Sequence, residues 1–192
     1  MNLENKQKSD LVSFFHVVCN LKQVRRSGWI HKANIPTPES VADHSYSMCM
    51  MSMVLSEILN LDTEHIMKMA NLHDLAESIV GDSMPDVISH NEKIIKEDAA
   101  MRKIISKLPD NLCKKYLDIW NEYIQNKTVS SKFVHNIDKL EMAIQAKAYE
   151  LDGYSKQSLQ LFLRSATDYI SDDKFELVSE ILQTINNNSD KI

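Results

Sequence analysis

The sequence predicts an all-α fold in a single domain that covers residues 1–192. Glycine occurs only three times and proline four times, so long stretches contain no helix breaker. Between these breakers, apolar residues recur every three or four positions, which is typical of a helix packed against a core. No segment alternates strictly between apolar and polar residues, as a half-buried strand would. With 43% hydrophobic residues, the chain can bury a substantial core.

The N-terminal part of the chain predicts two helices separated by a loop. The first helix is expected at residues 9–25, where apolar side chains follow the helical period. The segment 25–40, RRSGWIHKANIPTPES, is rich in breakers and predicts a loop. Ser40 is a suitable N-cap for the second helix, and Asp43 occupies the position that completes a capping box.

A third helix, expected from an N-cap at Thr63 to Gly81, carries the most informative residues of the chain. His73 and Glu77 lie on its apolar stripe, and Asp74 flanks them. A buried carboxylate without a partner is costly, so we expect these side chains to be paired or to bind a metal. The His-Asp step alone is common by chance, and Asp74 could simply orient His73. The metal hypothesis therefore needs further ligands.

The C-terminal part of the chain also predicts helices. Ser89 and Glu92 form a capping box for a helix that ends near residue 107, and Asp110 after proline opens another. A long helix begins at Ser130 or Ser131. Two more helices are expected at 155–170 and 172–186, which leaves a core of roughly 9–170 followed by a C-terminal helix.

Two other helices offer metal-competent side chains to the interior. His44 lies on the apolar line of the second helix, and Asp138 lies at the edge of the core stripe of the helix that begins near 131. Together with His73 and Asp74 they form a His₂Asp₂ set on three helices, suited to Mn²⁺, Fe²⁺, Co²⁺, Zn²⁺ or Mg²⁺. Taken singly, His44 could be an ordinary core histidine and Asp138 a surface acid. His135, one turn before Asp138, is a rival ligand, for which we favour a structural role.

The order His…His-Asp…Asp across helices resembles the HD-domain metal-dependent phosphohydrolases. The resemblance is closest to the small HD-domain 5′-deoxynucleotidases, which convert deoxynucleoside monophosphates to deoxynucleosides. It extends from about residue 11 to 155, and it is loose beyond Gly153. Ser83 departs from the family, which usually has an apolar or β-branched residue there. The matching stretches are LKQVRRSGW, PESVADHSYSM, LHDLAESIVGD, EDAAM, DIWNEY and KFVHNIDKLEMAIQAKAYE.

The resemblance implies an HD-fold helical bundle and a homodimeric phosphomonoester hydrolase with one divalent metal. Glu77 and Asp82 would be the acid–base pair near the leaving group and the attacking water. In this family the tryptophan at position 29 is associated with a preference for 2′-deoxyribose. The implied metal ligands are His44, His73, Asp74 and Asp138. The implied substrate contacts are Arg26, Trp29, His44, Asp82, Ser83 and Pro85.

Composition and charge restrict the partners. The net charge of −5 and the absence of a basic run argue against a polymeric nucleic acid. No apolar stretch is long enough to span a bilayer, and the polar start MNLENKQKSD does not resemble a signal peptide. Cys19, Cys49 and Cys113 are isolated in apolar helical contexts, which indicates reduced core thiols. We therefore expect a soluble, cytoplasmic protein.

Two other functions are compatible with these residues. One is an HD phosphohydrolase that acts on a cyclic nucleotide, an alarmone or a nucleoside triphosphate. A triphosphate would require more basic residues than the 25–40 loop offers. The other is a regulatory module that keeps the metal for structure alone. Glu77 and Asp82 argue against it, because a site without catalysis has no physical need for buried acids.

Overall fold

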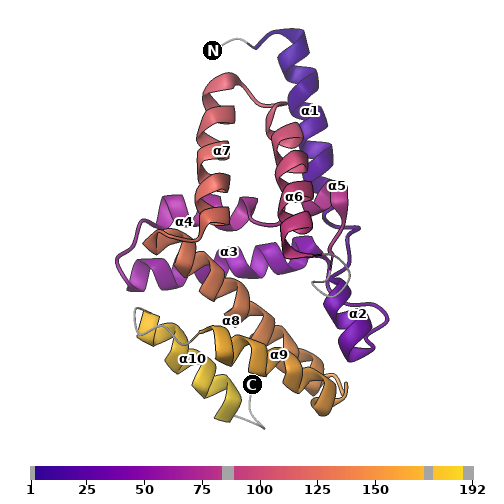
Figure 1. Ribbon diagram of the computed structural model, residues 1–192, viewed down its shortest axis with the longest axis vertical. Helices are drawn as coiled ribbons and strands as arrows, with labels where there is room; N and C mark the ends of the chain where they lie inside the picture. The colour runs from indigo at the N-terminus through magenta and orange to yellow at the C-terminus, as the bar shows by residue number, and fades with distance from the viewer. Residues whose placement is uncertain (1–2, 84–88, 171–174, 188–192) are drawn as a thin grey trace.

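The computed structural model is built of helices, as the sequence predicts (Figure 1). It describes residues 3–83, 89–170 and 175–187, and within these ranges there is no β-strand, only an isolated bridge between Arg25 and Ser40. None of the helices described is both long enough and apolar enough to cross a membrane. The helices are α1 (Asn5–Asn20), α2 (Ser27–Ala33), α3 (Val41–Ile58), α4 (Thr63–Leu72), α5 (Glu77–Val80), α6 (His90–Ile105), α7 (Asp110–Gln125), α8 (Val129–Leu151), α9 (Lys156–Tyr169) and α10 (Glu176–Asn187).

The helix α8 occupies the centre of the molecule and contacts α3, α4, α7, α9 and α10. At one end α6 stands between α1 and α7, while α3 and α4 cross the middle (Figure 1). At the other end α9 runs alongside α8. Because α8 is surrounded by helices, polar residues on its inner faces are buried and require partners.

Side-chain caps determine where several helices begin. The capping boxes predicted for α3 and α6 are both present, and in α3 the hydroxyl of Ser40 accepts from the Asp43 backbone N–H. The helix α8 begins slightly earlier than expected, because Thr128 is its N-cap and accepts from the backbone N–H of Ser131. Because the Thr128 hydroxyl already accepts from a backbone N–H of the first turn, the helix begins before Ser130 and Ser131.

The expectation of one continuous helix from Thr63 to Gly81 is wrong. The helix α4 has Asp62 as its N-cap and ends at Leu72, and α5 begins at Glu77 after a tighter turn. His73 Nδ1 lies 2.7 Å from the Ala70 carbonyl oxygen and uses it as a hydrogen-bond acceptor. In a continuing α-helix this oxygen would accept from a backbone N–H instead. The side chain therefore competes with the α-helical hydrogen bond, and the backbone turns.

Three smaller expectations also require correction. The first helix spans Asn5–Asn20, earlier than residues 9–25. The loop 25–40 contains the short helix α2, which ends at Asn34 in the left-handed conformation with φ of 55°. Cys19 is exposed, so it is not a core thiol, while Cys49 and Cys113 are half-buried.

Candidate functional site

Three of the four metal ligands suggested by the sequence, His44, His73 and Asp74, have donor atoms within 4.8 Å of one another, and the fourth, Asp138, adjoins them through His44. His44 projects from α3, His73 and Asp74 come from the turn after α4, and Asp138 comes from α8. The Nε2 atoms of His44 and His73 are 3.3 Å apart. Asp74 Oδ2 lies 3.0 Å from His73 Nε2, and Asp138 Oδ1 lies 3.3 Å from His44 Nε2. Side chains from three separate parts of the chain therefore share one small volume.

The hydrogen bonds on the far side of each imidazole assign its tautomer. His44 Nδ1 is 2.5 Å from Glu141 Oε2, and His73 Nδ1 is 2.7 Å from the Ala70 carbonyl oxygen. Both partners are acceptors, so in the neutral rings both Nδ1 atoms carry the hydrogen. The two Nε2 lone pairs then face each other beside two carboxylates. Such an arrangement is repulsive unless a positive charge lies between the donors, either a metal ion or a proton on His44 Nε2 beside Asp138, and two nitrogen and two oxygen donors fit a divalent metal.

The electrostatics of the centre also favour a cation. Burial and Arg26 oppose a positive charge on His44, yet its hydrogen bonds to Asp138 and Glu141 raise its pKa to about 10. Burial would raise the pKa of Asp138, but Lys139 and His44 hold it well below the usual range. Asp74 behaves in the same way, its pKa lowered against the effect of burial mainly by His73. Both aspartates are therefore charged at neutral pH.

Glu77 and Asp82 lie beside this centre in different environments. Glu77 is 1% exposed, its Oε2 has no hydrogen-bond partner among the residues the structure describes, and Oε1 lies 3.5 Å from Lys93 Nζ. Burial, followed by the charges of Asp74 and Asp82, raises the pKa of Glu77 well above its ordinary value. Asp82 Oδ2 accepts from the backbone N–H of Ser27 at 2.5 Å and from its hydroxyl at 3.0 Å. Glu77 is thus suited to hold a proton, and Asp82 connects α2 to the site.

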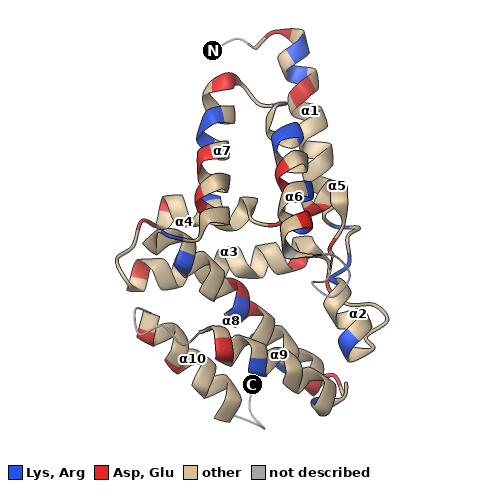
Figure 2. Cartoon of the chain, in the orientation of Figure 1, with Lys and Arg blue, Asp and Glu red and all other residues tan. Residues whose placement is uncertain are grey.

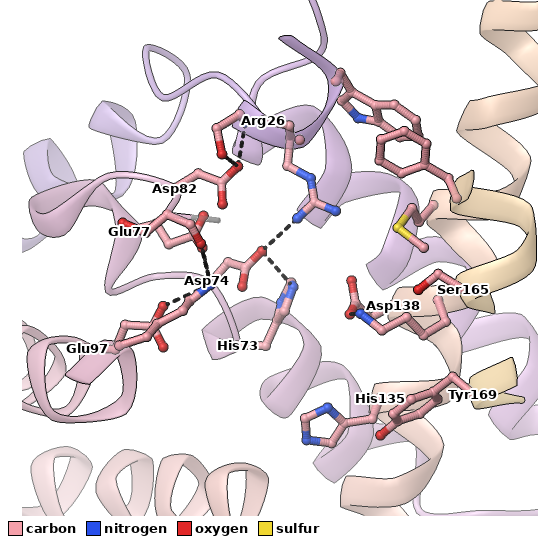
Figure 3. Close-up of a pocket in the computed structure, with 18 of the residues that line it drawn as sticks. Arg26, His73, Asp74, Glu77, Asp82, Glu97, His135, Asp138, Ser165 and Tyr169 are labelled. Atoms are coloured by element: carbon pink, nitrogen blue, oxygen red, sulfur yellow. Dashed lines mark hydrogen bonds and ion pairs between the residues drawn. The ribbon is translucent and has the colours of Figure 1, made fainter. Parts of the chain in front are cut away.

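Arg26 points toward the centre, whereas Trp29 belongs to the wall of the site. Arg26 Nη1 lies 3.4 Å from Asp74 Oδ2, a contact drawn as a dashed line in Figure 3. Arg26 Nε lies 3.9 Å from Glu39 Oε1. Trp29 is 1% exposed, stacks on Phe162 at 4.1 Å and donates from Nε1 to Glu39 at 2.9 Å. The indole is therefore held rigidly, and only a small part of it can meet a ligand.

A cavity of about 930 Å³ opens in front of the centre (Figure 3). Its volume is in the range of small-molecule sites, roughly 300–1,000 Å³. His73, Asp74 and Asp138 line it, as do Arg26, Trp29, Glu77, Asp82 and Ser83. His44 is fully buried and is not among the lining residues, so its suggested contact with substrate has no support in the geometry. Pro85 lies outside the described residues.

His135 does not join the metal donors. Its Nε2 lies 3.1 Å from the Tyr123 carbonyl oxygen, and the two rings stack at 4.1 Å. Burial lowers the pKa of His135, so the ring is neutral near pH 7. These contacts agree with the structural role favoured for His135.

Sequence reasoning missed several charged residues of the site, among them Glu39, Glu97, Glu141 and Lys93. Glu141 is 2% exposed and orients His44. It follows Ile137 by four residues, so an acid on the apolar stripe of α8 was a usable signal. Lys93 on α6 bridges Glu77 at 3.5 Å and Glu97 at 3.4 Å. No local pattern distinguishes it from an exposed helix lysine.

We expect the Glu141→Gln substitution to lower metal affinity about tenfold to a hundredfold. The carboxylate of Glu141 holds the His44 tautomer and increases the basicity of Nε2, and a neutral amide does both less well. Competition with a chromogenic chelator measures the dissociation constant for Mn²⁺ or Co²⁺ directly.

Glu122→Gln is the matched control, because Glu122 makes a similar 2.7 Å contact with His65 away from the centre. Unfolding temperatures of the metal-free proteins separate a loss of affinity from a loss of fold. Equal metal affinity in the Glu141 and Glu122 variants would contradict the orienting role of Glu141.

Comparison with known proteins finds related sequences and structures. The model of the family described as HD domain matches residues 18–178. The human protein named 5′-deoxynucleotidase HDDC2 is 38% identical over 89% of this chain and 84% of its own length. The Saccharomyces cerevisiae protein named 5′-deoxynucleotidase YGK1 is 30% identical over 90% of this chain and 81% of its own length. The crystal structure of the PH0347 protein from Pyrococcus horikoshii superposes with a TM-score of 0.79 at 27% identity, covering 92% of this chain and 98% of that one.

Proposed function

Because the chain belongs to the HD domain family, we propose that it is a 5′-deoxynucleotidase, a hydrolase that removes the 5′-phosphate from 2′-deoxynucleoside monophosphates. The observation that carries the proposal is the convergence of two imidazole nitrogens and two carboxylates beside a cavity of nucleotide size. Relatives in human, frog and yeast bear the name 5′-deoxynucleotidase.

In this proposal His44, His73, Asp74 and Asp138 hold one divalent metal. When bound, the ion lowers the pKa of a coordinated water and withdraws charge from the phosphoryl oxygens. The nitrogen and oxygen donors suit Mn²⁺, Co²⁺, Mg²⁺, Fe²⁺ and Zn²⁺ alike. The buried partners of the two imidazoles, Glu141 and the Ala70 carbonyl, occupy the Nδ1 atoms and would leave both Nε2 atoms available to the ion.

The remaining charged residues bind the phosphate and move protons. The planar guanidinium of Arg26, held between Asp74 and Glu39, offers hydrogen bonds to phosphate oxygens. Glu77 retains a proton because of its burial and can donate it to the 5′-oxygen as the ester bond breaks. Asp82, whose Oδ2 is fixed by Ser27, would accept the proton of the attacking water.

A panel of nucleotides tests the proposed reaction. We expect phosphate release from the four deoxynucleoside monophosphates, with slower release from ribonucleoside monophosphates, and none from cyclic nucleotides, triphosphates or alarmones. Chelation should abolish the activity, and an added divalent metal should restore it. Asp74→Asn should lower kcat/KM at least about a thousandfold, because a charged ligand is lost. A preference for any other nucleotide class would refute the assignment.

The pH dependence of kcat/KM tests the role of Glu77. The raised pKa means that Glu77 is protonated over a wider range than an ordinary glutamate. Activity should therefore be present below this pKa and fall as the pH rises through it. Glu77→Gln should lower kcat about 10²–10⁴-fold and remove this alkaline decrease.

Glu97→Gln is the control, since Glu97 contacts the same Lys93 and lines the same cavity. It should retain the alkaline decrease. A Glu77 variant that keeps both the wild-type rate and the wild-type profile would exclude Glu77 as the acid.

We also propose that the protein forms a homodimer through α3. Tyr46, Met50, Val54 and Ile58 follow one another at intervals of four residues and are between 43% and 70% exposed. A contiguous apolar stripe of this kind is unusual on the surface of a monomer. The charged residues of the helices are interspersed, with acids and bases mixed (Figure 2), and the net charge is −5. A second copy therefore fits this stripe better than a polyanion does.

Val54→Glu should convert the dimer to a monomer, because two charges would be buried opposite each other across the interface. Light scattering during size-exclusion chromatography measures the mass. Leu151→Glu, at an exposed leucine near the C-terminal end of α8, is the control and should leave the mass unchanged. A monomeric wild-type protein would contradict the dimer.

A further inference from the structure

The cavity has two flanks of different character. One flank carries charged groups. Glu77 comes from α5, Asp82 follows that helix, and Lys93 and Glu97 come from α6. Figure 3 shows Glu77, Asp82 and Glu97 on one side of Asp74, with Ser165 and Tyr169 on the other side. The metal donors lie between the two flanks.

The opposite flank is an apolar face contributed by α8 and α9. On α9, Leu159, Leu163 and Ala166 are buried in the core, whereas Leu161 is 53% exposed and Tyr169 is 40% exposed. An amphipathic helix usually places polar residues outside its core stripe. A single exposed leucine needs no explanation, but several apolar side chains around one cavity do. The apolar face consists of Met142, Leu161, Phe162 and Tyr169. The same flank also carries Ser165 and one charged group, Lys139, which is paired with Asp138 at 2.8 Å and lies 5.8 Å from the centroid of the Tyr169 ring.

The position of the phosphate decides which flank receives the rest of the nucleotide. In the proposed function, on which this inference rests, the phosphate would lie at Arg26 and at the ion that the metal donors would hold. The sugar and base must then extend along one flank. Covering the charged flank with an aromatic ring would remove water from several ionised groups, which is unfavourable. Covering the apolar face removes apolar surface from water, which is favourable.

We propose that the nucleobase binds with its ring plane against the apolar face, so that Leu161 and its neighbours determine base affinity. The four bases differ in the hydrogen-bonding groups on their edges, and contact with the ring plane leaves these groups unbound. The apolar face can therefore bind all four bases. Purines gain more than pyrimidines, because the larger ring system buries more area. This subsite belongs to the base alone and takes no part in the hydrolysis.

A substrate that lacks the base tests the inference. Leu161→Ala should lower kcat/KM for 2′-deoxyadenosine 5′-monophosphate about tenfold, through loss of apolar contact. It should change kcat/KM for 2′-deoxyribose 5-phosphate by less than roughly twofold, because that substrate makes no contact at the apolar face. Leu151→Ala removes an equally exposed leucine outside the cavity and should affect neither substrate.

Equal losses for the two substrates, or no loss for the deoxynucleotide, would overturn the inference. If Leu161→Ala unfolds at a lower temperature than the wild type, Leu161→Gln keeps a side chain of similar size at this exposed position but removes apolar contact, and a selective loss for the deoxynucleotide is still expected. Absence of phosphate release by the wild type would refute the proposed function instead. Equilibrium binding of the deoxynucleotide to the wild type and to Leu161→Ala would then still test the apolar face.

Discussion

The arrangement of the whole molecule depends on bringing two imidazole lone pairs and two carboxylates together inside a helical protein. Without a metal ion or a proton on His44 these groups repel one another, and they have little contact with water. Rigid helices hold them in place, since α3, the turn after α4 and α8 are packed together around the centre. The fold therefore supplies the free energy that keeps a cation-binding site assembled.

The same constraint explains features that would otherwise be irregular. His73 forms its hydrogen bond with the Ala70 carbonyl at the expense of a continuous helix, and the resulting turn directs both His73 and Asp74 to the centre. Glu141 is buried because the opposite side of His44 requires an acceptor. Glu77 is a further buried acid near Asp74 and Asp82, and its pKa is raised by its burial and by the charges of these two aspartates. One cluster of charges thus creates the metal site and the acid next to it.

Much of the fold and of the candidate site could be predicted because the relevant signals are local. The spacing of residues alone predicts the helices of the C-terminal half and the capping box of Ser40. It also predicts which polar residues lie on the apolar stripes of their helices. The break after Leu72 was missed because it depends on a side chain competing for a backbone carbonyl. The short helix α2 was missed because a segment rich in breakers hides a single turn or two of helix.

Helical periodicity and polar residues on an apolar stripe are properties of neighbouring residues, so the amino-acid sequence is enough to predict the helical class and the residue types available for metal chemistry. How these residues act depends on the tertiary structure. It showed that Glu141 orients His44, that Trp29 lies in the wall against Phe162, and that the cavity has one mainly charged flank and one mainly apolar flank. These features come from side chains far apart in the chain, and the distances between them are determined by packing, which no local pattern encodes.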